Sequence, residues 1–118
     1  KYTVNSYLAS KVIFFNELHD LFLQSGSKET WENFINIVSK DKRIGNSHMQ
    51  VPGPDGRYGF GGACFPKDCG AFYEYSNLKE SPLNVLKKVI DKNNLIRSSY
   101  DNETARETDQ RINFLPKE

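Results

Sequence analysis

The longest helical pattern in this chain runs from about Thr3 to Gln24 and constrains the fold class more than any other feature. Apolar residues recur within it at helical spacing: Leu8, Val12, Phe15, Leu18 and Phe22. Ile13, Phe14 and Leu21 widen this apolar surface, so we expect a helix that is buried on most sides. Gly26 favours the end of the helix, because glycine accepts the left-handed conformation that commonly follows a helix C-terminus.

The same spacing predicts three shorter helices. The first extends over 28–39 and is capped by Ser27, and the second extends over 65–76. The third extends over 82–97, is capped by Ser81 and has a proline at its first position. The side chains that we expect to face the core from these helices are Trp31, Phe34, Ile35, Val38, Phe72, Tyr75, Leu83, Leu86, Val89 and Ile90.

These patterns predict an all-α fold with one helical domain over 1–97 and a polar tail over 98–118. The sequence shows no βαβ alternation and no Gly-x-Gly-x-x-Gly between a strand and a helix, so it does not predict a dinucleotide-binding fold. The tail is either a helical extension or the start of a linker. Ile112, Phe114 and Leu115 are the residues that would dock it locally.

Composition excludes several classes of protein. The formal net charge is +1, with 16 basic and 15 acidic residues interspersed, which argues against a nucleic-acid partner held by bulk electrostatics. No apolar run approaches the roughly 20 residues of a membrane span, and no signal-peptide pattern opens the chain. Two cysteines are too few for a disulfide scaffold and favour a reducing, cytoplasmic location.

A cysteine follows a glycine-rich run in the middle of the chain, where residues 59–68 read GFGGACFPKD. Glycines allow a backbone to pass close to a ligand. Pro66 suits the first position of a helix, which places Cys64 at or next to the N-cap. There the helix dipole and Lys67 favour the thiolate over the thiol. Asp68 lies one turn on, where it is placed to handle a proton or a water, so the segment predicts a nucleophilic cysteine.

The other candidate groups have weaker signals. Cys69 is five residues from Cys64, which suits neither zinc ligation nor an intrahelical disulfide, so we expect it to pack in the core and expect no metal. His19 lies in the first helical pattern and is interpreted as a surface or packing residue. The Gly- and Pro-rich stretch over 41–65 leads directly to the cysteine, and a loop of this length favours a substrate-binding role.

Three ordered motifs, spread over roughly the first two thirds of the chain, resemble the nucleotide-sugar 6-dehydrogenases of the UDP-glucose dehydrogenase family. Residues 59–68 resemble the active-site signature of that family. The opening KYTVNSYLA, followed by FFNE at 14–17, looks like the helix that carries the catalytic lysine and asparagine of the family. DKRIGN at 41–46 resembles the segment that supplies a substrate-binding arginine.

The resemblance implies a four-electron oxidation of a sugar C6 alcohol to a uronic acid, with two NAD molecules consumed. Cys64 would be the nucleophile that forms a thiohemiacetal and then a thioester. Lys1 and Asn5, spaced i, i+4 on one helical face, would stabilise the developing oxyanion. Asp68 would assist proton transfer or the hydrolytic water, and Lys67 would contact NAD.

The resemblance assigns the substrate-binding residues less completely than the catalytic residues. The resemblance assigns Arg43 to the sugar nucleotide of a neighbouring subunit, which implies a homodimer. It assigns the backbone of Gly59, Phe60, Gly61 and Gly62 to the substrate loop, and His48 falls where relatives contact the sugar. Gln50, Arg57 and Tyr58 remain unassigned, because the loop over 46–58 does not align closely. The residues that surround the cysteine favour UDP-glucose as the substrate, and GDP-mannose is the alternative.

Two further alternatives remain open from the sequence. Because no dinucleotide-binding motif is present, we expect this domain to be inactive alone and to work beside an NAD-binding domain. The same observation is compatible with a helical association module that performs no chemistry. A cysteine-dependent hydrolase is a weaker reading, since neither His19 nor His48 has a clear reason to lie beside Cys64.

Overall fold

The computed structural model describes residues 1–104, 107–108, 112 and 114, and the described residues form α-helices joined by loops, without a strand. The helices are α1 (Tyr2–Gln24), α2 (Trp31–Val38), α3 (Cys64–Leu78) and α4 (Asn84–Ser98). The predicted all-α fold is therefore confirmed. No helix among the described residues is long and apolar enough to cross a membrane.

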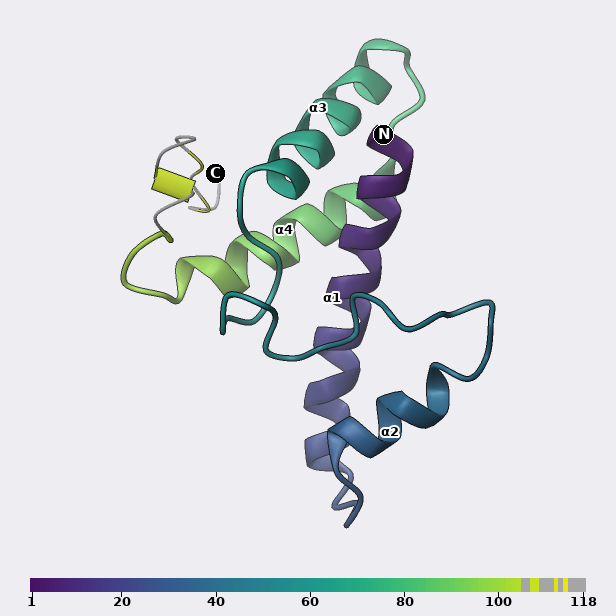
Figure 1. Ribbon diagram of the computed structural model, residues 1–118. Coiled ribbons are helices and arrows are strands. Elements are labelled where there is room, and N and C mark those ends of the chain that lie inside the picture. The colour runs from purple at the N-terminus through teal and green to yellow at the C-terminus, as the bar shows by residue number, and fades with distance from the viewer. Residues whose placement is uncertain (105–106, 109–111, 113, 115–118) are drawn as a thin grey trace.

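The helix α1 organises the molecule, because it contributes to both hydrophobic clusters. Figure 1 shows α3 and α4 beside its N-terminal part and α2 near its C-terminal end, with the long loop between α2 and α3 passing across it. Ala9 and Ile13 pack with side chains of α3, α4 and Phe60. Phe15 packs with Ile35 of α2 and with Met49 of the long loop. One helix thus joins the two halves of the core.

Two helix starts were predicted wrongly, because the neighbouring serines make other hydrogen bonds. The N-cap of α2 is Thr30, whose Oγ1 accepts the Asn33 N–H at 3.1 Å. Ser27 instead accepts the Glu29 N–H in a local turn. Ser81 does not cap α4, since its own N–H donates to the carbonyl of Ser76 and α4 begins later, at Asn84.

Pro66 also lies elsewhere than expected. The helix α3 begins at Cys64, so Pro66 occupies the third helical position instead of the first. This shift costs no hydrogen bond, because the N–H groups of a first turn lack intrahelical partners. Cys64 still lies directly after the N-cap, Ala63.

The expectation that α1 is buried on most sides is wrong. Phe14 and Leu21 are 63% and 65% exposed, because only one face of α1 meets α3 and α4. Tyr75 of α3 and Leu83 before α4 are likewise exposed, and Tyr73 packs against the core in the place expected for Tyr75. Phe114 of the tail is buried, whereas Leu115 lies outside the described residues.

Asn93 of α4 fastens the long loop to the helical core. It is 1% exposed, its Oδ1 accepts the Phe60 N–H at 2.7 Å, and its Nδ2 donates to the Phe60 carbonyl at 2.9 Å. Both backbone groups of a buried loop residue are therefore satisfied by one side chain. Burying such groups without partners would cost free energy comparable to the lost hydrogen bonds.

Asn93→Ala should lower the free energy of unfolding by about 2–4 kcal/mol, because it leaves both Phe60 backbone groups without their partners. Equilibrium urea denaturation measures this change. Asn94→Ala on the same helix serves as the control and should shift stability by less than about 0.5 kcal/mol. Equal effects of the two substitutions would contradict the role assigned to Asn93.

Candidate active site

The backbone of the glycine segment 59–62 is held by buried side chains from three parts of the chain. Asn16 of α1 accepts the Gly59 N–H at 2.8 Å, and Asn93 binds both backbone groups of Phe60. Glu107 of the tail accepts the Gly62 N–H at 2.8 Å. These hydrogen bonds therefore hold the backbone that directly precedes Cys64.

The structure gives physical reasons for three glycines in this segment. Gly59 and Gly62 both have a φ of +75°, a conformation that side-chain-bearing residues rarely adopt. A Cβ on Gly59 would also lie 2.5 Å from Asn93 Oδ1. A Cβ on Gly61 would overlap the side chains of Glu107 and Arg97. Two of the three glycines are thus required by close packing against the side chains that hold the loop.

Cys64 is exposed at the first position of α3 and lines a pocket of about 800 Å³. The other residues that line the pocket come from α1, the long loop, α3, α4 and the tail: Val12, His48, Gln50, Gly53, Pro54, Asp55, Gly59, Phe60, Gly61, Gly62, Ala63, Phe65, Arg97 and Thr104. A volume in this range suits a small-molecule ligand. The thiol, the glycine segment and His48 therefore share one concave site.

Asn5 and Asp68 meet across the interface of α1 and α3. Asn5 Nδ2 donates to Asp68 Oδ2 at 2.7 Å, and Asp68 is 4% exposed. Asp68 lies one turn after Cys64 on α3, and its carboxylate is buried whereas the thiol is exposed. Lys1 is the N-cap of α1, is exposed, and its ammonium lies 6.0 Å from the ring centroid of Tyr2.

His48, which the resemblance places where relatives contact the sugar, lines the same pocket as Cys64. Its φ of +62° turns the loop, and its ring stacks on Phe65 at a centroid distance of 5.6 Å. Burial and the positive charge of Lys11 lower the pKa of His48. The pocket therefore offers a neutral imidazole at pH 7.

Five predicted site residues are absent from the lining of the Cys64 pocket: Lys1, Asn5, Arg43, Lys67 and Asp68. Arg43 is exposed, and its guanidinium binds both carboxylate oxygens of Asp41, at 3.0 and 2.7 Å. This pairing raises the pKa of Arg43 and lowers the pKa of Asp41. Lys67 is exposed in the first turn of α3. Neither side chain lines the pocket of Cys64.

Cys69 and His19 lie in the core. Cys69 is fully buried, and desolvation raises the pKa of its thiol to about 11. The ring of His19 is 7% exposed and packs edge-on against Trp31 at 5.0 Å and against Tyr58 at 5.8 Å. Both residues are packed as the sequence interpretation expected.

Sequence reasoning missed the buried polar residues that support the loop, Asn16, Asn93, Arg97 and Glu107, and the exposed Asp55 that pairs with Arg97. Two signals could have found some of them. Asn93 and Arg97 are spaced i, i+4 and therefore share one face of α4. Thr104 and Glu107 have the spacing of a capping box, and they exchange hydrogen bonds in that pattern.

Comparisons with known proteins identify the family of the chain. The UDP-glucose/GDP-mannose dehydrogenase family, central domain, matches residues 1–95. The chain is 38% identical over 95 residues to the UDP-glucose 6-dehydrogenase of Rickettsia prowazekii (strain Madrid E), which is 80% of this chain and 20% of that protein. It is 32% identical over 115 residues to UDP-glucose 6-dehydrogenase YwqF of Bacillus subtilis (strain 168), or 98% of this chain and 23% of that one.

The chain thus spans about a fifth of the length of these relatives. No solved structure matches it. The family match covers more than three quarters of the chain and includes α1, the glycine segment, Cys64 and most of α4. The chain therefore belongs to the UDP-glucose/GDP-mannose dehydrogenase family, of which it forms the central domain.

Proposed function

We propose that this chain is the catalytic and dimerising domain of an NAD-dependent UDP-glucose 6-dehydrogenase. The observation that carries the proposal is an exposed thiol that lines a ligand-sized pocket, with Asp68 one turn further along α3 and hydrogen-bonded to Asn5 of α1. The relatives that match the chain are named as UDP-glucose 6-dehydrogenases, which supports UDP-glucose as the substrate. The activity would require further domains.

In the proposed reaction, Cys64 supplies the nucleophile. The C6 alcohol of the sugar loses a hydride and a proton to give an aldehyde, and the thiolate adds to its carbonyl carbon to form a thiohemiacetal. Loss of a second hydride from C6 and of the hydroxyl proton gives a thioester. Water then attacks the acyl carbon and breaks the C–S bond, which releases the uronic acid and the thiolate.

Polar groups beside the thiol would stabilise the charge that develops on oxygen. The Asn5 amide is oriented by its hydrogen bond to Asp68, so no reorientation is needed during the reaction. Lys1 lies one turn earlier on the same side of α1 and would add a positive charge. The Asp68 carboxylate would accept a proton from the hydrolytic water.

The pocket walls would bind the sugar nucleotide. The neutral His48 and the amide of Gln50 can hydrogen-bond sugar hydroxyls, and both line the pocket with the glycine segment. Arg43 lies outside this pocket and is fully accessible, which fits an arginine that reaches the site of a second subunit. Its planar guanidinium suits a diphosphate.

NAD would accept the two hydrides. Lys67 is the residue of this chain that would contact NAD, because its exposed ammonium lies in the same helical turn as the thiol. The N-terminus of that helix would also favour the diphosphate of NAD. A reduced thiol is also compatible with a cytoplasmic location.

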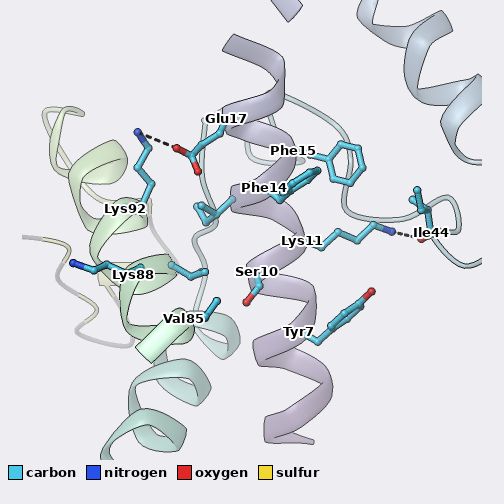
Figure 2. A pocket seen from close by; sticks show the side chains of 12 residues that line it. Tyr7, Ser10, Lys11, Phe14, Phe15, Glu17, Ile44, Val85, Lys88 and Lys92 are labelled. Atoms are coloured by element: carbon cyan, nitrogen blue, oxygen red, sulfur yellow. Dashed lines mark hydrogen bonds and ion pairs between the residues drawn. The ribbon is translucent and has the colours of Figure 1, made fainter. Parts of the chain in front are cut away.

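An exposed apolar stripe on α1 supports a homodimer. Val4, Tyr7, Phe14 and Leu21 follow a near-heptad spacing, and each is more than half exposed. Figure 2 shows Tyr7 and Phe14 projecting from α1 and Val85 from α4, around a groove of about 700 Å³. A second copy of this chain would bury the stripe and bring Arg43 toward a neighbouring pocket.

The activity is tested in a chimera in which this chain replaces the 115 aligned residues of the Bacillus subtilis enzyme YwqF. The chimera should reduce two NAD per UDP-glucose, and Cys64→Ser should lower kcat by roughly a thousandfold or more, because the nucleophile is lost. Absorbance of NADH and chromatography of the product measure both. Cys69→Ser is the matched control. Uronic acid formation at the parent rate by the Cys64→Ser chimera, or turnover of GDP-mannose alone, would contradict the proposal.

The two thiols should differ sharply in reactivity. At pH 9, iodoacetamide should modify Cys64 and leave Cys69 unmodified in the folded chain, because Cys69 is buried and its pKa lies near 11. The pKa of the Cys69 thiol is higher in the folded chain than in the unfolded chain. Burial of this thiol therefore contributes its full stability below about pH 9, and the contribution is lost as the pH rises from about 9 to 11. Peptide mass spectrometry separates the two sites, and equal labelling would contradict the assignment.

Phe14→Asp should convert the proposed dimer to a monomer, because a charge on the stripe would have to be desolvated at the interface. Sedimentation velocity measures the association state. Leu78→Asp alters a similarly apolar residue that is 82% exposed outside the stripe, and it should leave the dimer intact. A wild-type chain that sediments as a monomer at high concentration would refute the dimer.

A further inference from the structure

The segment after α4 folds back onto the loop that precedes Cys64. Tyr100 Oη accepts the Tyr58 N–H at 2.9 Å, and Arg57 Nη2 donates to Asn102 Oδ1 at 3.1 Å. The Arg57 guanidinium lies over the Tyr100 ring at 4.7 Å. These contacts join the tail to Arg57 and Tyr58, the two residues directly before the glycine segment.

Glu107 makes the contact that lies nearest to the cysteine. Its side chain is fully buried, and each carboxylate oxygen has a different partner. Oε1 accepts the Thr104 N–H at 3.0 Å within the tail, whereas Oε2 accepts the Gly62 N–H at 2.8 Å in the loop. A buried carboxylate is tolerated only with such partners, so the position of Glu107 and that of the Gly62 peptide are coupled.

Arg97 holds this carboxylate in place. Its side chain is 2% exposed, and its guanidinium lies 3.6 Å from Glu107 Oε2 and 2.8 Å from Asp55 Oδ2. It also donates to the Gly59 carbonyl at 3.5 Å. One buried cation thus connects the start of the glycine segment, Asp55 of the long loop, and the tail. The absence of room for a Cβ at Gly61 shows how closely Arg97 and Glu107 approach the loop.

We propose that Glu107 and Arg97 are positioning residues for the Cys64 thiol. They fix the Gly62 peptide, which lies two residues before the cysteine, and so fix the start of α3. The tail after α4 is then a part of the active site. The positioning of Cys64 for catalysis rests on the proposed function, but the coupling of Glu107 to Gly62 does not depend on a substrate.

The coupling is tested in the full chain by amide hydrogen exchange, measured by NMR. In Glu107→Ala, the Gly62 amide should exchange roughly tenfold faster than in the wild type, because its acceptor is lost. Ile13 on α1 reports global opening and should change far less. Glu107→Gln keeps the shape and an oxygen acceptor but removes the charge, so the Gly62 amide should exchange roughly threefold faster than in the wild type. This variant replaces Glu107→Ala if the alanine variant does not fold.

Glu103→Gln, at an exposed position of the same tail, is the matched control and should leave the Gly62 amide unchanged. Equal acceleration at Gly62 and Ile13 would show that Glu107 acts only on global stability and would overturn the proposal. An unchanged Gly62 amide in a folded Glu107 variant would overturn it as well.

The effect of Glu107 on the Cys64 thiol is measured separately. The rate of Cys64 alkylation by iodoacetamide at fixed pH should change by roughly threefold or more in Glu107→Gln and not in Glu103→Gln, because thiol reactivity depends on its local environment. A rate equal to that of the wild type would overturn the positioning role. An inactive chimera, by contrast, would count against the proposed function alone, since neither measurement on the chain uses a sugar nucleotide.

Discussion

The reciprocal pair between the Asn93 side chain and the Phe60 backbone is the interaction on which the rest of this structure depends. A loop of more than twenty residues crosses a small helical domain and must bury part of its backbone without a strand to pair with. Each buried N–H and carbonyl then needs a side-chain partner. Asn93 supplies two such partners from a rigid helix, and Phe60 can therefore enter the main core cluster beside Ala9 and Ile13.

The two cysteines of α3 lie in opposite environments. Cys64 lies at the exposed start of α3, directly after the anchored segment, whereas Cys69 lies five residues later on the buried side of the helix. The helix supplies the difference, since a five-residue offset turns the side chain to another face. One element thus presents a thiol to the pocket and encloses another in the core.

The polar residues near the glycine segment and Cys64 form two groups. Asn5 and Asp68 join α1 to α3 by a hydrogen bond. Arg97 and Glu107 are buried, and with Asp55 of the long loop they form a charged group whose members contact the backbone of Gly59 and Gly62. The Glu107 carboxylate accepts two backbone N–H groups, which offsets the cost of burying it.

The sequence by itself determined the helical fold class and the central motif. Apolar spacing over 3–24 and in the later segments predicts helices, because a helix repeats its core-facing positions locally. The motif GFGGACFPKD is likewise local, because all of its residues lie within ten consecutive positions. Helix starts were less certain, since Ser27 and Ser81 are good caps that the chain uses in other turns.

Only the tertiary structure decided which side chains meet. Asn93 lies 33 residues from Phe60 along the chain, and Glu107 lies 45 residues from Gly62, so no local spacing encodes either contact. Tertiary packing also decided that Phe14 stays exposed while its neighbour Phe15 is buried. Local patterns specify which face of a helix is apolar, but burial depends on whether another element of the fold covers that face.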